Sequence, residues 1–210
     1  MKKTMGMGAA AVLLCASAGS ADTLEFFLST EFSGAQTPAG AGPYLKAVFD
    51  DGGGAGSVTL TLTSLLIGAA EKVSNWAFNL DPALDSSALG VAYSSGVAAA
   101  LTSTGNNHYK ADGDGEYDIR FDFAGDLGPA GSGSSSVYVL TLAGITASSF
   151  DFLSNPAGGH GPFPTAAHVQ GIGPGGGGSG WITVPIPQTA YLGFAGLALA
   201  AGVGVIKRRR

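Results

Sequence analysis

The sequence predicts an all-β protein, a single antiparallel β-sandwich of jelly-roll-like form, with one helix-forming segment at each end of the chain. Three stretches alternate polar and apolar residues with the period of two expected of strands that bury one face: 57–63, 117–123 and 137–142. Turns rich in glycine and serine separate them, notably 50–54 and 128–136. Short strands separated in this way, without an amphipathic helix, are typical of β-sandwiches.

The remaining expected strands are shorter. Trp76 occupies an apolar position in one of them, which places it in the core rather than on a sugar-binding surface. One helical turn is expected over 83–89. Together the strands define one β-sandwich domain over residues 22–170, a usual size for a single domain. The further expected strands cover 24–29, 44–49, 73–80, 90–93, 150–153 and 167–172.

The N-terminal residues 1–21 have the composition of a signal peptide. Two lysines follow Met1, an apolar stretch comes next, and small residues ending at Ala18 or Ala21 offer two cleavage sites. The body is therefore expected to be exported by the Sec machinery.

Cys15 raises the alternative of a lipoprotein. Leu14 precedes it, however, at a position where lipid attachment requires a small residue. Because Cys15 lies in the segment to be removed, the mature chain is expected to have no cysteine. Its stability then comes from its core rather than from disulfides.

The C-terminal residues 184–210 have the layout of a cell-envelope sorting signal. Two prolines in a short motif keep the chain extended and accessible to a processing enzyme. The uncharged segment 189–206 would form a helix of about 27 Å, slightly shorter than a ~30 Å hydrocarbon core. The basic tail 207–210 would remain cytoplasmic and leave the body outside. The motif residues are Val184, Pro185, Ile186 and Pro187.

This tail resembles the PEP-CTERM sorting signal, a Pro-Glu-Pro motif followed by a transmembrane helix and an arginine-rich end. Val184, Pro185 and Pro187 match the usual Val-Pro-Glu-Pro form, and Ile186 stands where glutamate is usual. The resemblance implies an exosortase-like transpeptidase as a partner, an inner-membrane anchor before processing, and delivery to the cell surface or an exopolysaccharide matrix. An uncut membrane anchor is the alternative.

The body is also similar to uncharacterised domains of PEP-CTERM proteins. The stretches that carry this resemblance are 76–82, 110–115 and 167–172. The resemblance covers most of the exported domain. It implies a location and assigns no activity.

Residues 171–183 predict a flexible linker between the body and the tail, because most of them up to Gly180 are glycine. Trp181 and Ile182 leave open a last edge strand at the end of this segment.

The charge of the body is strongly acidic. Fifteen acidic residues lie between Asp22 and Asp151, and only Lys46, Lys72, Lys110 and Arg120 balance them, which gives a net charge of −11. Repulsion from a phosphate backbone argues against nucleic acid as a partner. A solvated, self-repelling surface explains this charge without a specific function.

Residues 112–118, here called the acidic segment, are the one constellation with chemical content. Carboxylates at alternate positions, with glycines between them, suit a loop that wraps a calcium ion. A strand follows, where an EF-hand would continue to a later bidentate glutamate and a helix, so an acidic hairpin turn is the simpler alternative. The candidate calcium ligands are Asp112, Asp114, Glu116 and Asp118.

The common enzyme motifs are missing from the sequence. It has no Gly-x-Ser-x-Gly, no His-Glu-x-x-His and no phosphate-binding loop, and no histidine has a second zinc ligand at motif spacing. We therefore expect a non-enzymatic structural or binding protein of the surface or matrix, with exopolysaccharide as a candidate ligand. The alternative is an extracellular carbohydrate-active or calcium-dependent hydrolase, or a lectin, on the same scaffold. A hydrolase would need carboxylates from different strands to converge in a groove.

Overall fold

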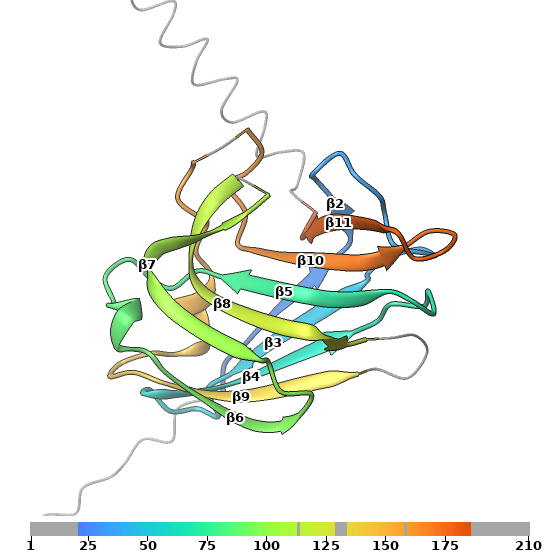
Figure 1. Ribbon diagram of the computed structural model, residues 1–210. Helices are drawn as coiled ribbons and strands as arrows, with labels where there is room; N and C mark the ends of the chain where they lie inside the picture. Colours follow the sequence, from blue (N-terminus) through green and yellow to red (C-terminus); the bar gives the residue numbers. More distant parts are fainter. Residues whose placement is uncertain (1–20, 113, 129–133, 158, 186–210) are drawn as a thin grey trace, which may run out of the picture.

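The computed structural model describes residues 21–112, 114–128, 134–157 and 159–185. They form two antiparallel sheets packed face to face (Figure 1), which confirms the predicted all-β fold of two antiparallel sheets. Within these ranges, no helix has the length and apolar character needed to span a membrane. Most of the expected signal peptide, and the expected helix 189–206 with its basic tail, lie outside the described residues.

The five-stranded sheet contains the most regular alternation in the sequence. Thr59, Thr61 and Thr63 face outward on its central strand, while Val58, Leu60 and Leu62 are fully buried. The strands lie in the spatial order β1 (Thr23–Leu28), β3 (Leu45–Asp50), β4 (Ser57–Ser64), β9 (Ser135–Thr141) and β6 (Gly90–Gly96).

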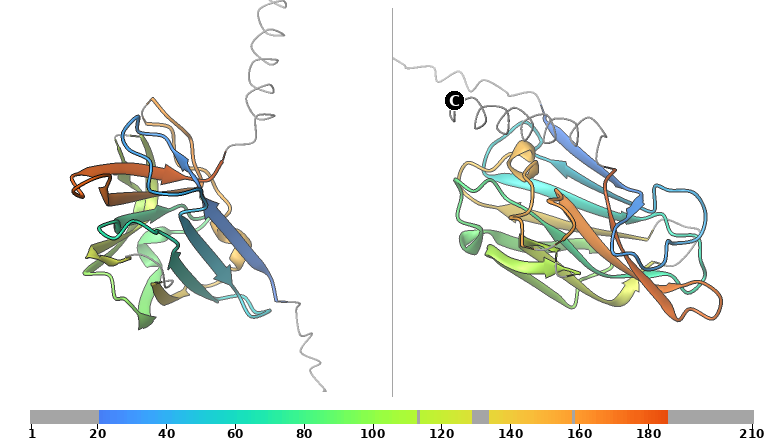
Figure 2. Two further views of the ribbon diagram at one scale, coloured as in Figure 1. Left: turned by 90° about the vertical axis from the view of Figure 1, so that its right-hand side faces the viewer. Right: turned by 90° about the horizontal axis from the view of Figure 1, so that it is seen from above.

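The six-stranded sheet packs against it. Its spatial order is β2 (Thr30–Glu31), β11 (Gly178–Thr183), β10 (Thr165–Ile172), β5 (Lys72–Phe78), β8 (Asp114–Leu127) and β7 (Leu101–Ala111). β1 begins at one end of the sandwich, and β11 ends beside the other end of β1, where the Ser29 amide donates to the Thr183 carbonyl at 2.9 Å (Figure 2).

The main core is aromatic and lies between the sheets. Phe49 stacks on Phe150 at 4.3 Å between ring centroids and meets Phe78 edge-to-face at 5.3 Å. Trp76 is fully buried, and its indole N–H donates to the Thr165 hydroxyl at 2.9 Å, so its only polar atom has a partner. The prediction that Trp76 is a core residue is confirmed.

Two local predictions need correction. Residues 150–153 do not form a strand, because Phe150 ends the 3₁₀ helix η2 (Ala147–Phe150), which a capping box between Thr146 and Ser149 begins. The long strand β7 was not predicted, because Gly105 and the two asparagines after it have the composition of a turn. The expected helical turn within 83–89 is confirmed as η1 (Ser86–Ala88).

The expected linker over 171–183 is also corrected, because these residues complete the β10–β11 hairpin. β11 pairs with β10 on one side and β2 on the other, and the side chain of Thr183 is fully buried. Glycine is required here for packing: a Cβ on Gly171, at φ +80°, would lie 1.8 Å from the Ala70 carbonyl oxygen. The sheet therefore continues to Thr183, directly before the predicted sorting motif.

A second, smaller apolar cluster covers the outer face of the six-stranded sheet. Ala77 and Ala166 face outward there and pack with Ala111 and Tyr117 from the β7–β8 hairpin. The register of β7 against β8 shifts between Thr104 and Ala111, which lets the hairpin bend over the sheet. Partly buried Phe32, Tyr109 and Trp181 complete this second cluster.

Candidate functional site

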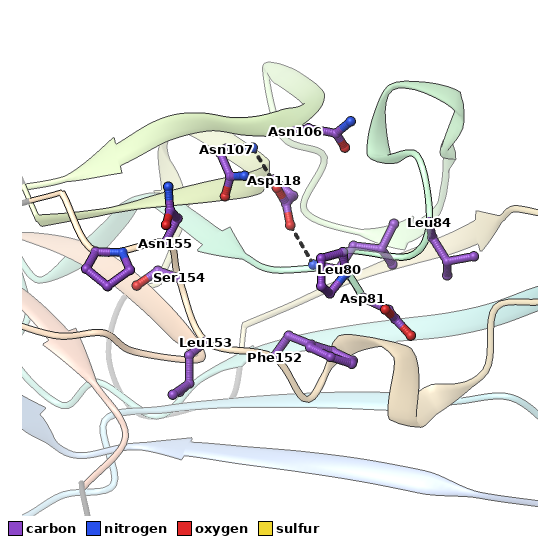
Figure 3. A pocket seen from close by; sticks show the side chains of 12 residues that line it. Leu80, Asp81, Leu84, Asn106, Asn107, Asp118, Phe152, Leu153, Ser154 and Asn155 are labelled. Atoms are coloured by element: carbon purple, nitrogen blue, oxygen red, sulfur yellow. Dashed lines mark hydrogen bonds between the residues drawn. The ribbon is translucent and has the colours of Figure 1, made fainter. Parts of the chain in front are cut away.

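A cleft of about 510 Å³ lies beside the end of β5, between the chain leading to η1, strands β7 and β8, and the chain that follows η2 (Figure 3). Its lining combines amides and carboxylates with apolar side chains, of which Leu153 is exposed. The polar residues are Asp81, Asn106, Asn107, Asp118, Ser154 and Asn155, and the apolar ones include Leu80, Leu84, Phe152 and Leu153.

Asp118 fixes the wall of the cleft. One of its carboxylate oxygens accepts the Leu80 backbone N–H at 2.9 Å, and the other accepts the Asn107 backbone N–H at 2.7 Å (Figure 3). The carboxylate therefore ties the end of β5 and the middle of β7 to β8. Asn107 has a positive φ of 50°, a conformation that asparagine adopts more readily than most residues.

Asn106 holds η1 against the cleft. Its side-chain oxygen accepts the Ser86 backbone N–H at 2.9 Å and the Ser86 hydroxyl at 2.6 Å. Asp85 caps the same turn. Hydrogen bonds from the Ser87 hydroxyl and backbone N–H, and a weaker one from the Asn106 amide, lower the pKa of Asp85.

The opposite wall of the cleft is tied to β8 by a short antiparallel bridge. The Glu116 and Asn155 backbones exchange hydrogen bonds of 2.8 and 3.1 Å. Leu153 is 60% exposed in this wall. Asp81 accepts the Ala83 backbone N–H at 2.8 Å, which shapes the turn toward η1. The cleft thus has a rigid polar frame around an accessible apolar side chain.

The acidic segment does not act as one unit in the described residues. Asp112 lies at the hairpin tip with a positive φ of 51°. A carboxylate oxygen of Glu116 lies 3.8 Å from the Lys110 ammonium nitrogen, and the other accepts a hydrogen bond from the Asn155 side-chain amide at 3.3 Å. Asp118 instead lines the cleft. The described residues contain no group of three or more metal-ligating side chains. The side chain of Asp114 lies outside them, so calcium binding by the four residues stays a prediction.

The first half of the predicted sorting motif lies on the body. Val184 is partly buried and packs against the main core. Val184 and Pro185 also line a second pocket of about 440 Å³, together with Phe32, His160 and Phe163. The Phe32 and Phe163 rings are 4.6 Å apart. Ile186, Pro187 and Ala18 lie outside the described residues, and Ala21 precedes β1.

His168 lies on the outer face of the six-stranded sheet. Its ring stacks on Trp181 at 4.9 Å between centroids, and its Nδ1 atom is 2.7 Å from the Ser74 hydroxyl. Burial lowers the pKa of His168, and the charge of Asp112 opposes this shift. The imidazole is therefore neutral at pH 7, as a packed surface histidine would be.

Sequence reasoning missed most of the cleft. Asn106, Asn107 and Asn155 were not predicted as site residues, and Asp118 was predicted as an ion ligand rather than a cleft wall. The adjacent Asn106 and Asn107 are the one local signal in the sequence, since asparagine is typical of tight bends, and Asn107 does have a positive φ.

The fold and the cleft define a two-sheet antiparallel β protein with a polar cleft beside the end of one central strand. No protein-family model, curated protein or solved structure matches this chain.

Proposed function

We propose that this protein is an exported, non-enzymatic component of the cell surface or extracellular matrix that binds a polysaccharide segment in the cleft. In this proposal a jelly-roll-like sandwich carries the cleft, a signal peptide directs Sec export, and the PEP-CTERM-like tail anchors the chain in the inner membrane until an exosortase-like transpeptidase acts. The observation that carries the binding proposal is the lining of the cleft.

A sugar residue offers hydroxyl groups around its ring and apolar C–H groups on its faces. Amide side chains such as Asn107 and Asn155 can both donate to and accept from hydroxyls, and Leu153 offers an exposed apolar surface beside them. The Asn107 backbone N–H donates to Asp118, and the Asn155 backbone pairs with that of Glu116, so the backbones that carry both amides are held before a ligand arrives, which lowers the entropic cost of binding.

Asp81 and Asp118 favour the rival function, an extracellular hydrolase, because two carboxylates from different segments line one cleft. Their hydrogen bonds argue for a structural role instead. Both oxygens of Asp118 accept backbone N–H groups, and an oxygen of Asp81 accepts another. A general acid needs a carboxyl oxygen that is free to reach the substrate, and both oxygens of Asp118 are already engaged by backbone N–H groups.

The test uses the extracellular polysaccharide purified from the cells that make the protein. We expect Leu153→Ser to weaken binding at least tenfold by isothermal titration, because it removes apolar contact from the cleft. Ile67→Ser is the matched control, since Ile67 is also 60% exposed and lies outside the cleft. Equal affinity of the unmodified protein, Leu153→Ser and Ile67→Ser for the polysaccharide would refute the cleft as the binding site.

Two additions separate the rival functions. Release of reducing ends from the same polysaccharide, abolished by Asp81→Asn, would establish a hydrolase. We expect no release, and we expect binding to survive calcium removal by EGTA, because Glu116 and Asp118 have protein partners. Loss of binding in EGTA would instead support the calcium site predicted in the acidic segment.

The sorting proposal has its own test, the intact mass of the protein recovered from the envelope and medium of its own cells. We expect a chain that starts near Ala21 and ends between Val184 and Thr189. A chain that retains Arg210 would contradict processing and leave the uncut anchor.

A further inference from the structure

Strand β6 forms one edge of the five-stranded sheet. Among the described residues it pairs with β9 alone, and Gly90–Tyr93 do so in continuous register before a shift at Ser94. All residues of β6 except Val91 are exposed. Because β9 occupies one side of the strand, the backbone groups on the other side face no strand of the described chain.

This edge is uncharged in an otherwise acidic body. From Ser86 to Tyr109 the sequence has no aspartate, glutamate, lysine or arginine, and this run contains all of β6 and most of β7. The body carries a net charge of −11, so two copies repel each other when their acidic surfaces approach. When two copies approach along β6, the strands that meet carry no charged residue, so the electrostatic repulsion between the copies is smallest there.

The other three sheet edges are less suited to pairing. β1 carries Glu25, whose carboxylate lies 2.7 Å from the Lys46 ammonium, and β2 has only two residues. β7 is interrupted by register shifts against β8 and carries Lys110. Charges, short length and irregular register are the features by which natural edge strands resist pairing. The Gly90–Tyr93 part of β6 is uncharged and keeps a continuous register with β9, and it is longer than β2.

An exposed aromatic side chain lies on the same strand. Tyr93 is 51% exposed and meets the buried Tyr138 ring edge-to-face at 6.0 Å. A second strand beside β6 would cover part of Tyr93 and add apolar burial to the backbone hydrogen bonds.

We propose that β6 pairs antiparallel with β6 of a second copy of this chain, so that the two five-stranded sheets join into one continuous sheet. The contact is isologous, since each copy offers the same strand, and it closes at a dimer. A single edge is small compared with a standard interface, so the association is weak and depends on concentration. Crowding of copies on a surface or in a matrix would favour it.

Sedimentation equilibrium of the chain recovered from its cells, at concentrations from roughly 10 µM to 1 mM, tests this proposal. We expect reversible dimers, and Ala92→Lys should weaken them at least tenfold by placing two like charges at the joined edge. Thr59→Lys is the matched control. Thr59 and Ala92 both pair with Val139 in one row on the outer face, and both are exposed, but Thr59 lies on the central strand β4 and not at the edge. Thr59→Lys should dimerise as the unmodified protein does.

A second measurement does not depend on the folding of the charged variant. Because the expected mature chain has no cysteine, Ala92→Cys should form intermolecular disulfides under mild oxidation much faster than Thr59→Cys. Monomers throughout the concentration range, or equal behaviour of the variants at positions 92 and 59, would overturn the proposal.

Discussion

The two faces of the six-stranded sheet differ in how they are packed. The inner face carries large side chains such as Trp76, Phe78 and Phe121, all fully buried against the other sheet. The outer face carries Ala77 and Ala166, and the β7–β8 hairpin bends onto them. Small residues on the outer face let the hairpin approach closely, and this approach brings β7 and β8 to the cleft. The main core thus maintains the fold, while the second cluster positions the candidate site.

The largest effect should come from the inner face. Phe78→Ala removes a fully buried ring that contacts Phe49, Trp76 and Phe121, and we expect it to lower the free energy of unfolding by about 3–5 kcal/mol. Urea denaturation measures this change. The control is Phe27→Ala, where the ring is 43% exposed and the loss should stay below about 1 kcal/mol. Similar losses for both variants would contradict the assignment of the core.

A smaller effect is expected at the cleft wall. Asp118→Asn replaces an acceptor oxygen by an N–H donor that faces another backbone N–H, so we expect a loss of about 1–3 kcal/mol. Asp122→Asn changes the same charge on the same strand, at a part-exposed ion pair with Arg120, and should cost about 0–1 kcal/mol. Urea denaturation measures both losses. A larger loss in the free energy of unfolding for Asp122→Asn than for Asp118→Asn would contradict the role of Asp118 in holding the cleft wall.

The second cluster should tolerate truncation better than the main core. Tyr109→Ala removes a partly buried ring, and we expect a loss of about 1–2 kcal/mol. The change should act locally, so amide hydrogen exchange should accelerate in β7 and β8 and stay constant in β4 and β9. Uniform acceleration across both sheets would show that the second cluster and the main core unfold as one unit.

The smallest effect concerns His168 and pH. Burial lowers its pKa below the ordinary 6.5, so the unfolded chain binds the proton more readily than the folded one. The neutral His168 side chain therefore contributes its full stability above about pH 6.5. This contribution declines as the pH falls from about 6.5 towards the lowered pKa of the folded state. His168→Gln should remove that part of the decline, whereas His108→Gln, at an exposed position of β7, should leave it unchanged. Identical pH profiles for the two variants would contradict this role of His168.

Regular alternation made the central strands predictable from the sequence. The threonines of β4 follow a strict period of two, the burial of β9 alternates in the same way, and both strands lie within two residues of where they were expected. Phe150 shows the limit of this signal, because a buried aromatic residue from a 3₁₀ helix fills the same core as one from a strand. Periodicity reports burial, and a short run cannot distinguish the two backbones.

Glycine and asparagine caused the larger errors. Their conformational freedom predicts loops, yet Gly171 is needed where the β10–β11 hairpin approaches Ala70, and Asn107 is needed within β7. The cleft could not be predicted, because the partners of Asp118 lie 11 and 38 residues away in the sequence. Only the bend of β7 and β8 over the sheet brings these segments together.

Amide hydrogen exchange with and without the purified extracellular polysaccharide tests the central claim most directly. The account predicts protection of the amides of residues that line the cleft, with little change on the outer face of the five-stranded sheet. These residues are Leu80, Asp81, Leu84, Asn106, Asn107 and 152–155. Protection confined to that outer face, or no protection at saturating polysaccharide, would contradict the assignment of the cleft as the binding site.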